Sequence, residues 1–130
     1  MTPVRMHRML IFAATLLLVM GIAHSYLGER YILVRLFQRE NLPKLHGGTA
    51  FTVGTLRFVW HLTTVAWLGL ACLTFLTSYG PISRDQVLLV IGVAALISAA
   101  FPLYFTQGKH LSWIVFIVVG ALVLVARSNH

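Results

Sequence analysis

The sequence predicts an all-α integral membrane protein, a four-helix bundle whose antiparallel helices run up and down across the bilayer. Hydrophobic residues make up 58% of the 130-residue chain and charged residues 10%, against about 45–50% and about 25% in soluble domains. The apolar residues gather into four stretches separated by short polar connections. Crossing the apolar core of a bilayer takes about 20 such residues. We therefore expect one transmembrane domain covering residues 1–130.

The four stretches predict helices at about residues 9–26, 51–79, 86–105 and 111–126. The first stretch follows Arg5 and Arg8 and ends in the small-residue segment Gly21-Ile22-Ala23, a pattern that a cleaved secretory signal also shows. Three further hydrophobic stretches follow it, which favours a first helix that is retained.

The connection at residues 29–45 mixes aliphatic residues with basic residues spaced four or five apart. This pattern is typical of an amphipathic helix that lies in the membrane interface, with its basic side chains at the headgroups. Pro43 would end such a helix, because the residue before a proline avoids helical geometry. An extension of the first helix into water fits the pattern equally well.

The two later connections are short. Residues 79–83 contain Gly80 and Pro81, and Ser83 or Asp85 can cap the third helix. Gly108 suits the end of the third helix. Helices two to four are therefore expected to be sequential neighbours.

Small residues along the third helix predict close helix packing. In lipid, helices associate largely through close backbone approach, since no hydrophobic force draws them together. Whether the packing partner belongs to the same chain or to another copy stays open. The predicted packing residues are Gly92, Ala95, Ser98 and Ala99.

Ten Lys and Arg against three Asp and Glu give a net charge of +7. In so apolar a chain this charge favours the bilayer and its anionic lipid headgroups as partners, and no nucleic-acid motif is present.

An even number of helices places both termini and the second connection at one end, which we call the terminal end. The first and third connections lie at the opposite end, which we call the loop end. Basic residues are almost balanced between the ends, so orientation rests on Arg5 and Arg8 before the first helix, which favour cytoplasmic termini. Trp60 and Trp113 fit an aromatic belt at the loop end.

A polar stripe runs along the second helix, where positions 54, 57, 61, 64, 68 and 72 share one face. A charged side chain such as Arg57 is costly inside a bilayer and usually faces protein or water. Three interpretations are open for Arg57: it snorkels to the headgroups, it pairs with Glu29, or it binds an anionic ligand.

Three histidines are expected at the loop end, one from each of three helices. Imidazole is a common metal ligand and can hold haem iron, although a histidine at a helix end also anchors at the interface or bonds a neighbouring helix. Glu29 is the acidic residue nearest to them in this prediction, and it could orient an imidazole or balance Arg57. The candidate ligand residues are His24, His61, His110, Arg57 and Glu29.

Two functional hypotheses follow. The favoured one is a structural or accessory membrane subunit, in a homo-oligomer or a larger membrane complex, because no catalytic residue set is recognisable and an enzyme is not favoured. The alternative is a membrane protein whose loop-end site binds haem, a metal ion or a small anion and supports electron transfer or transport. The sequence does not identify a cofactor.

Overall fold

The computed structural model describes residues 2–128 and is entirely helical apart from its connections. The first helical run begins as α1 (Pro3–Leu27), widens into a π-helical turn, η1 (Gly28–Leu33), and ends as α2 (Val34–Phe37). It is followed by α3 (Ala50–Thr77), α4 (Arg84–Phe105) and α5 (Ser112–Ser128). Three helical runs, Pro3–Phe37, Ala50–Thr77 and Arg84–Phe105, are long and apolar enough to span a membrane. This confirms the predicted helical class and is consistent with a membrane protein.

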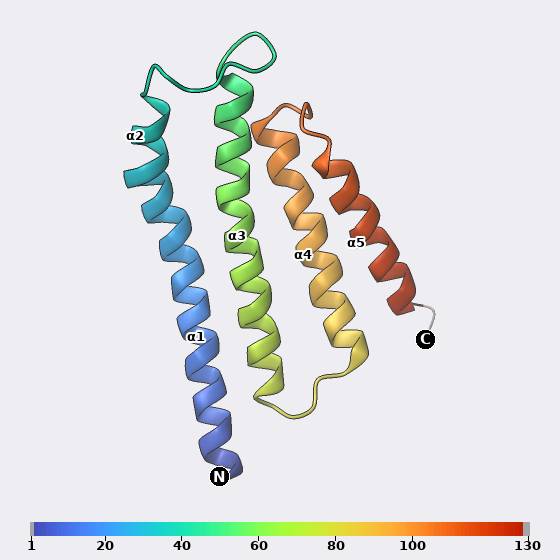
Figure 1. Cartoon of the computed structure of the whole chain (residues 1–130). Coiled ribbons are helices and arrows are strands. Elements are labelled where there is room, and N and C mark those ends of the chain that lie inside the picture. The colour runs from blue at the N-terminus through green and yellow to red at the C-terminus, as the bar shows by residue number, and fades with distance from the viewer. Residues whose placement is uncertain (1, 129–130) are drawn as a thin grey trace.

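The helices lie side by side in an open row, in the order α1, α3, α4, α5 (Figure 1). Extensive contacts join each helix to its neighbour in the row. The connection between α3 and α4 lies at the same end as the N-terminus, and the connections after α2 and α4 lie at the opposite end (Figure 1). A row has little interior, so only a few apolar side chains are buried among the described residues: Ala14, Leu33, Phe58, Val65, Ala71, Ala99 and Pro102.

The helical bounds differ from the predicted ones mainly in the first run and the last helix. The first helix begins at Pro3, a favoured position for proline, instead of residue 9, and helical structure continues to Phe37. Residues 28–37 therefore extend the first helix and do not form a separate interfacial helix. The last helix, α5, has 17 residues, which lies at the lower limit of about 17–25 residues for crossing a bilayer.

The connections follow the predicted turn chemistry. Ser83 caps α4: its hydroxyl accepts the backbone N–H of Gln86 at 3.1 Å, and the Gln86 side chain accepts the Ser83 N–H at 2.9 Å. After α4, Gln107 and Gly108 both have a positive φ, of 54° and 74°. These two residues turn the chain directly into α5.

Glycines set the closest helix approaches. The Cα of Gly54 on α3 lies against the backbone carbonyl of Phe105 on α4, where a Cβ would collide with the oxygen. On α4, a Cβ at Gly92 would come within 2.7 Å of Leu124 on α5, and a Cβ at Gly120 within 2.6 Å of Leu96. The partner of Gly92 is thus in the same chain. Ser98 and Ala99 are also buried, and Ala95 is half-buried.

Gly54→Ala is expected to lower the free energy of unfolding by about 1–3 kcal/mol, because the new methyl group meets a backbone carbonyl that cannot rotate away. Gly69→Ala on the same helix is the matched control, since a Cβ there meets nothing within 4 Å. It should be neutral or raise stability by up to about 1 kcal/mol through helix propensity. Unfolding by SDS titration in mild detergent, followed by circular dichroism, measures both. Equal effects of the two substitutions would contradict this account of the α3–α4 contact.

Candidate functional site

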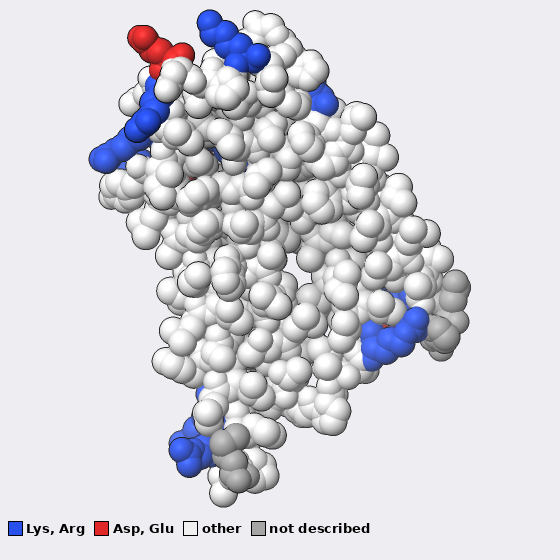
Figure 2. All heavy atoms as spheres, in the orientation of Figure 1, with Lys and Arg blue, Asp and Glu red and all other residues white. Residues whose placement is uncertain are grey.

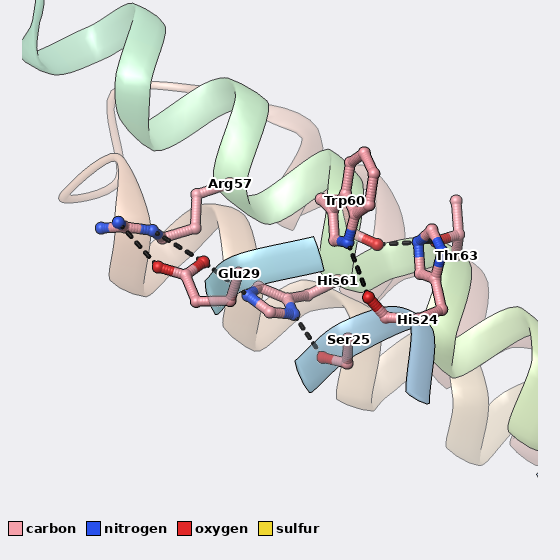
Figure 3. A network of polar contacts seen from close by, with 7 residues as sticks. All are labelled: His24, Ser25, Glu29, Arg57, Trp60, His61 and Thr63. Carbon is pink, nitrogen blue, oxygen red and sulfur yellow. Dashed lines mark hydrogen bonds and ion pairs between the residues drawn. The ribbon is translucent and has the colours of Figure 1, made fainter. Parts of the chain in front are cut away.

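A polar cluster lies between the first helical run and α3 near the loop end (Figure 3). Ser25 and Glu29 are four residues apart on one run, and Arg57 and His61 are four apart on α3. Residues with this spacing share a helix face. The two faces meet, so that Ser25 contacts His61 while Glu29 contacts both Arg57 and His61. We call these four residues the polar clasp.

The strongest contact in the clasp is a two-point ion pair. Arg57 Nη2 lies 2.8 Å from Glu29 Oε1, and Arg57 Nε donates to Glu29 Oε2 at 3.2 Å. Such paired geometry is the favoured one for guanidinium and carboxylate groups. The guanidinium also lies over two rings, with its Cζ 5.0 Å from the centre of Phe37 and 5.9 Å from that of Phe105. Of the three interpretations of Arg57, this geometry matches pairing with Glu29.

Both ring nitrogens of His61 have partners. Nε2 lies 3.4 Å from Glu29 Oε2, and Nδ1 lies 2.6 Å from the Ser25 hydroxyl. An imidazole nitrogen donates or accepts depending on the tautomer, and the Ser25 hydroxyl can do either as well. The ring also stacks near Phe101 and Phe105 of α4, at centroid distances of 6.1 and 5.7 Å. His61 thus connects three helices, and its side chain is only 14% exposed.

The partners of the His24 side chain are Trp60 and Thr63, which are not members of the polar clasp. Its ring stacks flat on the Trp60 indole, with centroids 4.5 Å apart and an interplanar angle of 5°. Its Nε2 lies 2.8 Å from the Thr63 hydroxyl, while Trp60 Nε1 donates to the His24 carbonyl at 3.1 Å. The Trp60 indole packs directly against Gly28, where a Cβ would collide with it. His24 therefore forms a second, adjoining contact between the same two helical runs (Figure 3).

His110 lies in the connection before α5. Its Nδ1 is 2.9 Å from the Ser112 hydroxyl, and its ring packs against Phe58 at 4.9 Å. The three candidate histidines thus have three separate sets of partners. Among residues 2–128, no group of three or more His, Cys, Asp or Glu side chains is arranged to hold a metal ion.

The π-helical turn η1 carries Glu29. A π-helical turn is wider than an α-helical one. Such turns are rare in proteins, and those that occur frequently lie at functional sites. Here the turn contains both Gly28, which admits the Trp60 indole, and Glu29, which reaches Arg57. The widened turn and the polar clasp therefore coincide.

Sequence reasoning missed several members of the site. Ser25 could have been found, because it lies one turn before Glu29 on the same face. The prediction for Trp60 was an interfacial belt and did not include the hydrogen bond that its indole donates to the first helical run. Phe37 and Phe105 carry no sequence signal for a contact with Arg57, since both come from distant parts of the chain.

The ion pair is expected to give a coupling energy of about 1–2 kcal/mol, between the values for exposed and buried pairs. The side chains of Glu29 and Arg57 are 33% and 29% exposed, so solvent or lipid headgroups can reach both of them. A double-mutant cycle with Glu29→Ala and Arg57→Ala, followed by SDS unfolding, measures this coupling. Glu40→Ala, at an exposed glutamate in the connection, is the control and should change little. A double mutant whose loss equals the sum of the single losses would show that the pair contributes nothing.

Comparisons with known proteins find no counterpart for this arrangement. The chain matches no protein-family model, no curated protein and no solved structure. The polar clasp and the open helical row are therefore the observations on which a functional proposal has to rest.

Proposed function

We propose that the chain is a multi-pass membrane protein that serves as a structural or accessory subunit, with antiparallel helices and cytoplasmic termini. The observation that carries the proposal is the open row, which leaves broad apolar surfaces at both edges, while the four residues of the polar clasp contact one another. On the face seen in Figure 2, charged side chains gather at the two ends of the helices, and the band between them is almost uncharged. A bilayer requires such a band in its apolar core.

Both edge helices present apolar stripes on which nothing from residues 2–128 packs. On α1 the stripe is Phe12, Leu16 and Val19, and on α5 it is Val115, Val118 and Leu122; Phe12 and Leu122 are each 65% exposed. The positions within each stripe are three or four residues apart and share a face. Such faces suit lipid, and they equally suit helices of a partner subunit.

The polar clasp supports this role more than a cofactor site. A haem held by two histidines needs both rings directed at one iron, whereas His61 is bonded to Ser25 and Glu29 and His24 to Thr63. The Arg57 guanidinium is neutralised by Glu29. We infer that the clasp holds α1 against α3.

The proposed crossing pattern is tested by cysteine labelling in sealed membranes. In a Cys72→Ala background, single cysteines at Thr2 and Ser83 should react with an impermeant maleimide only from the cytoplasmic side. Cysteines at Gly47 and Gln107 should react only from the other side, because each helix between them crosses once. Reaction of positions 2 and 47 from the same side would show that α1 does not cross, and a uniformly reversed pattern would show that the termini are not cytoplasmic.

The accessory role predicts a partner at one edge of the row. Chemical cross-linking in native membranes should give a species larger than the monomer, and either Leu16→Trp on α1 or Leu122→Trp on α5 should abolish it. Leu45→Trp, an exposed leucine in the connection after α2, is the control. A chain that stays monomeric in its own membrane would contradict the accessory role.

A further inference from the structure

A hollow separates α3 from α4 in the half of the row toward the terminal end. It has a volume of about 360 Å³, and Figure 2 shows an opening through the molecule. The two helices touch at Gly54 and Phe105 near the loop end and are joined at the other end by the connection after Ser78. The walls of the hollow are formed by Val65, Leu68, Gly69, Cys72, Leu89, Val90, Val93, Ala94 and Ile97.

The walls are apolar almost throughout. Apart from the Cys72 thiol, every lining side chain is aliphatic or, at Gly69, absent. A water molecule in such a site would lack the two to four polar partners that it needs. An α-helix with side chains is about 10 Å wide or more, which is too thick for this hollow. A hydrocarbon chain is thin, flexible and apolar, and it fits both the size and the chemistry.

The charge at the terminal end favours an anionic occupant. Leu89 lies five residues beyond Arg84, the first residue of α4, which corresponds to about 7.5 Å along a helix. Arg5, Arg8, Arg84 and Arg127 all lie at this end, and basic side chains are visible there on both sides of the opening (Figure 2). Asp85 is the one acidic residue at this end among those described, and it pairs with Arg127 at 2.9 Å. The end as a whole is therefore positively charged.

We propose that this hollow binds one acyl chain of an anionic phospholipid, whose phosphate lies near Arg84. The inference rests on the proposed membrane location and adds a specific lipid site to it. Lipid attraction to basic residues is electrostatic, while the hollow supplies the apolar contact that a general surface attraction lacks. The bound chain fills the space that α3 and α4 leave open.

Gly69→Leu tests the apolar part of the site. A Cβ at Gly69 meets nothing within 4 Å, so a leucine can enter the hollow without displacing the backbone. In native mass spectrometry of the detergent-solubilised protein, added phosphatidylglycerol should bind the wild type one to one and Gly69→Leu about tenfold more weakly, a loss of about 1.4 kcal/mol. Ala121→Leu, at an exposed position of α5, should bind as the wild type does. Unchanged binding by Gly69→Leu would overturn the proposal.

Arg84 tests the headgroup part. Arg84→Gln should remove the preference for phosphatidylglycerol over phosphatidylcholine, and Arg84→Lys should keep it because the charge remains. Equal binding of both lipids by the wild type, tighter binding of a free fatty acid, or a dimer in place of a lipid adduct would each overturn the assignment to a phospholipid. Alkaline carbonate extraction separates the two proposals: a chain washed from the membrane contradicts the proposed function, whereas an integral chain without a lipid adduct contradicts only this inference.

Discussion

The ion pair between Arg57 and Glu29 is the interaction on which the loop-end half of this molecule depends. A guanidinium within a long apolar helix needs a counter-charge or a route to polar surroundings, and the structure supplies Glu29 at 2.8 Å. Glu29 sits in a π-helical turn beside Gly28, where the Trp60 indole can pack against the backbone. His61 adds a contact to the same carboxylate and to Ser25. One acidic residue thus organises a contact that holds the first helical run against α3.

Helices α3 and α4 are in close contact near the loop end and lie apart toward the terminal end, and the same physical rule explains both. Close packing of helices in lipid requires residues without bulky side chains at the crossing. Gly54 provides such a crossing between α3 and α4 near the loop end, and Gly92 and Gly120 provide one between α4 and α5. Toward the terminal end, the facing positions of α3 and α4 are mostly Leu, Val and Ile. Side chains of this size do not allow the close backbone approach that Gly54 allows, and the hollow lies between them.

This asymmetry connects the fold to the proposed role. Near the loop end, Glu29 pairs with Arg57 and contacts His61, and Ser25 contacts His61 as well. Apolar surface remains at the two edges of the row, where lipid or a partner helix can pack, and in the hollow, which has room only for a thin hydrocarbon chain. Under the proposed function, the chain would contribute apolar surface to a membrane assembly, while the polar clasp holds its own first helical run against α3.

The sequence by itself determined the helical class, because the lengths and hydropathy of the apolar stretches are local properties of the chain. It also pointed to Glu29, Arg57 and His61, since ionisable residues are conspicuous in so apolar a background. The tertiary structure decided which of them meet: three interpretations of Arg57 were open, and the widened turn at Gly28–Leu33 together with the α1–α3 crossing selected Glu29. No spacing rule links residues on separate helices, so the separation of His24 and His110 from the clasp, the open row and the hollow could be known only once the helices were packed.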